Sequence, residues 1–175
     1  MSKKNKYHLD FEIDKLTRSI ENVATGDSFQ TEVSLLTSTD LKLVTKKSGW
    51  LFDWRQEFKR LERSTFKLTI TGNSDIVQGL ISIEERGNYV YMHLLESAPF
   101  NMGKNKVYVG VPGNLVAFAC LRSFQIGGAG FVSFQSKTKL IEHYVETLGA
   151  TYYGKHNLII ETEAATKLVR QYFKS

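Results

Sequence analysis

The chain has 175 residues, of which 42% are hydrophobic and 23% charged, and its formal net charge is +5. These values are typical of one globular domain long enough to bury a core, and no stretch approaches the roughly 18 to 20 apolar residues that a membrane helix needs. The single cysteine, Cys120, excludes an internal disulfide and predicts a cytoplasmic protein, and no cysteine or histidine spacing predicts a metal site.

The excess of positive charge suits a phosphorylated ligand or a nucleic acid. Lysines gather at residues 3–6, 46–47 and 104–106, but aromatic residues interleave with these clusters only weakly. Nucleic-acid binding is therefore possible but not indicated by the sequence.

The N-terminal third predicts a strand, a short helix and an aromatic cluster. Residues 7–13 alternate in part and favour a first strand. Asp14 can cap a helix over residues 15–22, because Leu16 and Ile20 would then share one face. An aromatic cluster that we expect to pack this part onto the rest follows, formed by Trp50, Phe52, Trp54 and Phe58.

The middle of the chain predicts an antiparallel meander. Residues 66–70, 77–85 and 89–96 read as three strands, and the segments between them contain glycine and asparagine, which favour tight turns. Pro99 should end or bulge the third strand, because proline has no N–H to donate to a ladder.

A glycine turn at residues 110–114 leads into an apolar helix over 115–124, which we expect to be buried against the sheet. A second glycine cluster at 127–130 precedes a short apolar strand at 131–134. Backbone N–H groups at the positive end of a helix dipole hold phosphate well. The glycine turn therefore predicts a phosphate-bearing small molecule as ligand.

The C-terminal part predicts two more helices and a last strand pair. Residues 140–148 carry a continuous apolar stripe, and Gly149 stands where a helix-ending glycine belongs. Residues 152–153 and 158–161 favour strands, and Thr162 can cap a final helix. The whole pattern predicts an α+β protein with helices on both faces of the sheet.

The order of elements over residues 66–161 resembles the GNAT superfamily of N-acetyltransferases. In that fold an antiparallel meander leads through a bulged strand to a phosphate-binding loop, a buried helix, a parallel strand, another helix and a final hairpin. The strand at 132–134, the helix at 140–148 and the sequence Leu148-Gly149-Ala150 resemble the family's strand, helix and Tyr-x-x-Leu-Gly-Phe ending. The whole chain is similar to a set of bacterial GNAT-like proteins with no assigned substrate.

The resemblance implies a GNAT-like (acyl-CoA N-acyltransferase) fold with a mixed, mainly antiparallel sheet in a single domain, residues 1–175. Residues 1–62 would supply the N-terminal strand, the first helices and the acceptor side. Residues 63–175 would supply the meander, the CoA-binding loop and helix, and the C-terminal half. The implied cofactor is acetyl-CoA or another acyl-CoA, and the implied acceptor is an amine on a small molecule, a protein or an RNA.

The resemblance also implies a set of site residues. Acyl-CoA would bind along the end of the third strand, at the glycine loop and at two nearby lysines, which gives Ser97, Ala98, Lys106, Gly110, Val111, Gly113, Asn114, Leu115 and Lys137. Two positions depart from the family's loop pattern, because Gly110 stands where arginine or glutamine is usual and Leu115 where a small residue is usual. Tyr144, the candidate general acid, lies one residue from the family's usual tyrosine position.

Glu96 is the candidate general base. By alternation it shares a face with Val90, Met92 and Leu94, whereas His93 points the other way. Burial of a carboxylate raises its pKa toward the range that suits a base. Two alternatives stay open at this point: a non-catalytic GNAT-like module that binds acyl-CoA or a partner, and a protein associated with nucleic acid.

Overall fold

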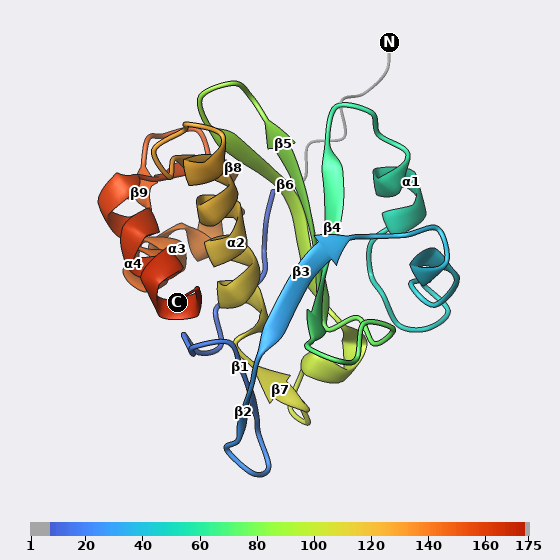
Figure 1. Ribbon diagram of the computed structural model, residues 1–175. Coiled ribbons are helices and arrows are strands. Elements are labelled where there is room, and N and C mark those ends of the chain that lie inside the picture. The colour runs from blue at the N-terminus through green and yellow to red at the C-terminus, as the bar shows by residue number, and fades with distance from the viewer. Residues whose placement is uncertain (1–7, 174–175) are drawn as a thin grey trace.

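The computed structural model describes residues 8–173, so Tyr7 and the basic cluster at 3–6 lie outside the described residues. Its main sheet has the strand order β3-β4-β5-β6-β8-β10-β9 (Figure 1). β6 and β8 run parallel, and the other neighbours run antiparallel. The strands are β3 (Thr31–Leu35), β4 (Ser64–Ile70), β5 (Gly79–Glu85), β6 (Val90–Ser97), β8 (Val132–Gln135), β9 (Thr151–Tyr152) and β10 (Asn157–Ile160).

A second, small sheet and the helices complete the fold. The small sheet has the order β2-β1-β7 and is formed by β1 (Ile20–Asn22), β2 (Ser28–Phe29) and β7 (Tyr108–Val109). The α-helices are α1 (Trp54–Phe58), α2 (Val111–Gln125), α3 (Ile141–Leu148) and α4 (Thr162–Tyr172). Three short 3-10 helices are η1 (Asp40–Lys42), η2 (Pro99–Asn101) and η3 (Thr138–Leu140).

Two apolar cores lie on opposite faces of the main sheet. Neighbouring residues of β5 and β6 alternate between them: Ile81 and Leu95 belong to the larger core with α2 and α4, whereas Leu80 and Leu94 pack with the buried tryptophans of the 50–54 region. The expected α+β class, the meander and the placement of helices on both faces are thus confirmed. α2 begins four residues before the expected position 115, with proline in its first turn, where no N–H is required.

The helix expected over residues 15–22 is wrong, and so is the strand over the described part of 7–13. Residues 8–19 form an extended stretch without regular structure, apart from one isolated parallel bridge between Leu9 and Ser136. The backbone N–H of Thr17 donates to the Tyr172 hydroxyl, and Ile20 pairs with Phe29 in β1–β2. A helix of eight residues is marginal in isolation, so these tertiary contacts decide the conformation.

A β-bulge in β6 corrects the expected orientation of Glu96. Ser82 pairs with Leu94 and Ile83 pairs with Met92, which leaves His93 as the extra residue. Beyond the bulge the alternation is inverted, so Glu96 shares a face with Leu94 but not with Met92, and His93 lies on the same face as Glu96. Simple alternation cannot reveal a one-residue insertion of this kind.

Within residues 8–173, no helix combines the length and the apolar character needed to cross a membrane.

Candidate functional site

The parallel strands β6 and β8 separate soon after they meet. Within residues 8–173 the two strands pair at Val90 with Val132 and at Tyr91 with Ser133, and β6 then continues to Ser97 without further pairing to β8. The N-terminal end of α2 lies near the far end of β6 (Figure 1). We refer to the space between the separated strands as the groove.

The chain's own N-terminal segment, residues 8–17, lies in the groove. The N–H of Leu9 donates to the Gln135 carbonyl at 2.7 Å, and the N–H of Lys137 donates to the Leu9 carbonyl at 3.1 Å. The Gln135 carbonyl and the Lys137 N–H point away from β10, because the N–H of Ser136, which lies between them, donates to the His156 carbonyl on the β10 side. The segment therefore adds to β8 along the edge that β6 has left.

Tyr144 and its neighbour hold the middle of the segment. The Tyr144 hydroxyl donates to the carbonyl of Phe11, and His143 Nε2 accepts from the N–H of Ile13 at 2.9 Å. The Tyr144 side chain is fully buried, its ring packs edge-on against Phe134, and burial raises the pKa of its hydroxyl. The candidate acid thus faces the groove, and its proton already has an acceptor within the chain.

Asp14 lies at the start of α2, where the sequence predicts a bound phosphate. Its Oδ1 accepts from the Gly110 N–H at 3.1 Å, and its Oδ2 lies 3.1 Å from Lys106 Nζ. A carboxylate is favourable at this end of a helix dipole. Gly110 has φ +96°, and a Cβ there would lie 2.2 Å from Thr17 Oγ1, so the packing of residues 14–17 itself requires glycine.

The remaining backbone positions of the expected phosphate site are covered. Val111, Gly113, Asn114 and Leu115 are all buried. A Cβ on Gly113 would lie 2.3 Å from the hydroxyl of Tyr172, which shows how closely α4 packs on this turn. In this arrangement residues 14–17 and α4 lie directly against the glycine turn.

Glu96 is buried and accepts hydrogen bonds from the loop that leads into α1. Its Oε2 accepts from the Leu51 N–H at 2.7 Å, and its Oε1 accepts from the Phe52 N–H at 3.3 Å and from Trp54 Nε1 at 2.7 Å. Burial raises the pKa of Glu96, and the three donors oppose that rise. The carboxylate therefore anchors this loop to β6, whatever else it does.

Several of the expected site residues surround one cavity of about 350 Å³. This volume is at the lower end of the range for small-molecule sites, about 300–1,000 Å³. The cavity lies between the end of β6 and the N-terminal segment, and its lining includes Asp14, Glu96, Ser97, Lys106 and Pro112. The structure thus brings together the candidate base, one strand-end residue and one lysine.

Two expected cofactor residues lie elsewhere. Ala98 is buried in the core around the tryptophans, and its N–H donates to the Gln78 carbonyl. Lys137 pairs with Asp10 at 2.7 Å near the surface, which adds a further contact between β8's end and the N-terminal segment. The segment as a whole was not expected from the sequence, because its contacts join residues more than 90 positions apart.

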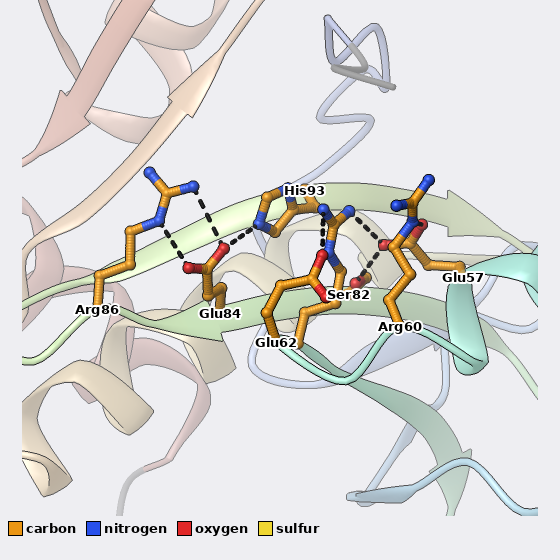
Figure 2. Close-up of polar contacts among 8 residues, drawn as sticks. Glu57, Arg60, Glu62, Ser82, Glu84, Arg86 and His93 are labelled. Atoms are coloured by element: carbon orange, nitrogen blue, oxygen red, sulfur yellow. Dashed lines mark hydrogen bonds and ion pairs between the residues drawn. The ribbon is translucent and has the colours of Figure 1, made fainter. Parts of the chain in front are cut away.

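A chain of paired charges crosses the face of the sheet opposite α2 (Figure 2). Glu84 Oε1 lies 2.7 Å from His93 Nε2, and burial lowers the pKa of His93 although this hydrogen bond opposes the change. Glu57 accepts from Arg63 and from the Ser82 hydroxyl. His93 is thus one member of a set of residues that pair with one another, which favours a structural role for it.

No protein-family model matches the chain, and no curated protein matches it at a significant level. Several solved structures do match the chain. A spermidine N-acetyltransferase SpeG chimera from Vibrio cholerae and hSSAT is 14% identical with a TM-score of 0.56, over 79% of this chain and 99% of that one. AtaTR bound with AcCoA is 15% identical with a TM-score of 0.53, over 79% and 98%. SpeG from Vibrio cholerae in complex with manganese ions is 13% identical with a TM-score of 0.51, over 79% and 96%. These likenesses show that the chain has the fold of the GNAT acetyltransferases.

Proposed function

We propose that the protein is an N-acyltransferase that transfers an acyl group, in the simplest case acetyl from acetyl-CoA, to an amine. The observation that carries this proposal is the separation of β6 from β8 beside the start of α2, with Glu96 and Ser97 on one cavity at that point. One solved structure of similar fold is bound with AcCoA, and another is a spermidine N-acetyltransferase. The chemical class of the acceptor amine stays open.

The donors at the start of α2 fit an anionic ligand. Gly110 N–H and Lys106 Nζ already hold an anion, which is the chain's own Asp14 carboxylate. A phosphate presents the same kind of acceptor to these two donors. When bound, acyl-CoA supplies an activated thioester carbonyl, and the phosphates would take the position of the carboxylate.

Three groups of this chain would then act at the reacting carbonyl. Backbone N–H groups of β6 beyond the bulge would polarise the carbonyl oxygen. Glu96 would accept a proton from the acceptor amine, directly or through a water molecule, as the nitrogen attacks and the C–S bond breaks. Tyr144 would give its proton to the leaving sulfur once Phe11 no longer accepts it.

A non-catalytic GNAT-fold module is the second candidate function. The filled groove favours it, because residues 8–17 lie in the space where the first proposal would place acyl-CoA. A cytoplasmic location, expected from the lone cysteine, is part of both proposals.

Turnover decides between the two functions. The full chain is incubated with acetyl-CoA and a panel of primary amines, which includes polyamines and lysine peptides, and release of CoA thiol is followed. An N-acyltransferase releases thiol in proportion to acetylated amine, and Glu96→Gln should reduce that rate by about 100-fold or more. Acetyl-CoA binding without turnover on any amine would instead support the non-catalytic module.

A further inference from the structure

The N-terminal segment, residues 8–17, makes contacts with β8 and with three of the helices around the groove. Leu9 adds to β8, Phe11 and Ile13 bond to the side chains of two consecutive α3 residues, and Asp14 bonds to the start of α2. Thr17 closes the series, since its N–H donates to the Tyr172 hydroxyl of α4. A tail that only lay on the surface would not make contacts at each of these elements.

The segment presents the same chemical groups that an acyl-CoA would present. The pantetheine arm of CoA carries amides, and the segment offers the main-chain amides of Leu9, Phe11 and Ile13 along the groove. The pyrophosphate of CoA is an anion, and the segment offers the Asp14 carboxylate to Gly110 and Lys106. A bound acyl-CoA would therefore compete with the segment for these donors and acceptors.

The release of the segment would expose Leu9 and Ile13, which are buried in the larger core, but it would break no strand pairing within either sheet. Its residues form no helix and no multi-residue strand pairing, and Asp10, Glu12 and Lys15 are not buried. The chain is fixed again at β1, where Ile20 pairs with Phe29 and Glu21 pairs with Val109. A release of residues 8–17 would thus leave both sheets intact.

We propose that the N-terminal segment is an intramolecular competitor of acyl-CoA, so that the chain alternates between a closed state and an open state able to bind the cofactor. This inference rests on the proposed function, because it takes acyl-CoA as the groove's other occupant. Cofactor affinity is then reduced by the fraction of molecules that are closed. Any change that weakens the segment's contacts increases affinity for CoA.

The test measures CoA affinity by calorimetry for the full chain and three variants. Asp14→Asn removes the charge held by Gly110 and Lys106, and loss of such a charge-assisted contact predicts about tenfold tighter binding of CoA. Leu9→Ala weakens the segment without changing its charge and should tighten binding several-fold. The charge control is Glu163→Gln, since it removes one negative charge from an exposed side chain of α4 that does not line the cavity, and it should leave affinity within twofold.

Hydrogen exchange on the same proteins identifies the mechanism. The amides of Leu9, Ile13 and Thr17 donate hydrogen bonds in the closed state, so they should be protected in the free protein and lose protection when CoA binds. Equal CoA affinity in all four proteins, with these amides still protected in the complex, would overturn the inference and leave the proposed function standing. Absence of CoA binding in Leu9→Ala and Asp14→Asn, with these amides unprotected, would overturn both.

Discussion

A substitution at Gly113 tests how α4 covers the start of α2. A Cβ on Gly113 would lie 2.3 Å from the Tyr172 hydroxyl oxygen and 3.2 Å from the Tyr172 Cζ. The first distance is a clash that a rigid ring cannot avoid by rotation, and overpacking of this kind costs about 1–3 kcal/mol. Replacement of glycine by alanine in a helix returns up to about 1 kcal/mol. Gly113→Ala should therefore destabilise the protein by about 0–3 kcal/mol.

The loss of stability caused by Gly113→Ala should be smaller when Tyr172 is phenylalanine. Tyr172→Phe alone leaves the Thr17 N–H without its acceptor, which costs about 1–3 kcal/mol. It also removes the oxygen that the new Cβ would meet, but Leu16 Cδ2 and Tyr172 Cζ would still lie 3.1 and 3.2 Å from that Cβ, so Gly113→Ala in this background should cost about 1–2 kcal/mol less than in the parent protein. Urea unfolding of the four proteins, followed by circular dichroism, gives the coupling energy. Equal effects of Gly113→Ala in both backgrounds would refute the described packing.

Three further outcomes follow from buried groups. Burial alone would raise the pKa of Asp40, but hydrogen bonds from Thr37 and Lys67 outweigh it, so the pKa is lowered. The stabilising effect of Asp40 is therefore present above its ordinary pKa of 3.8 and is lost as pH falls through the lower folded value. Asp40→Asn should cost about 3–5 kcal/mol in urea unfolding at pH 7. Burial raises the pKa of Glu96, so this residue stabilises the fold below its ordinary pKa of 4.5, and the stabilisation is lost as pH rises through the folded pKa. The free energy of unfolding, measured over a pH series, should therefore decrease across this range. The decrease should be absent in Glu96→Gln. The Cys120 thiol is fully buried and burial raises its pKa, so a thiol reagent should modify the native protein only at the rate of unfolding, and fast labelling would contradict the packing of α2.

Local patterns in the sequence were sufficient for most of the fold. The strands of the meander and the helices α3 and α4 follow from apolar periods of two and 3.6 residues. Gly149 ends α3 with φ +70°, as a helix-ending glycine is expected to do. These features depend on neighbours within a few positions, which a single sequence displays directly.

The state of the groove could not be predicted, because it depends on contacts between distant residues. Asp14 has the sequence features of a helix cap, yet its carboxylate binds Gly110, 96 positions away. Leu9 pairs beside Ser136 without any pattern that marks it as a strand. The glycines that suggest a phosphate loop are required here by close packing against Thr17 and Tyr172. The same residue types suit both roles, so only the tertiary structure separates them.

The most direct test of the central claim is a crystal structure of the protein grown with millimolar acetyl-CoA. Our account predicts the ligand between β6 and β8, with its phosphates at Gly110 and Lys106 and its thioester near Glu96, and with residues 8–17 displaced. Residues 8–17 still in the groove, with acetyl-CoA bound elsewhere or not at all, would contradict it.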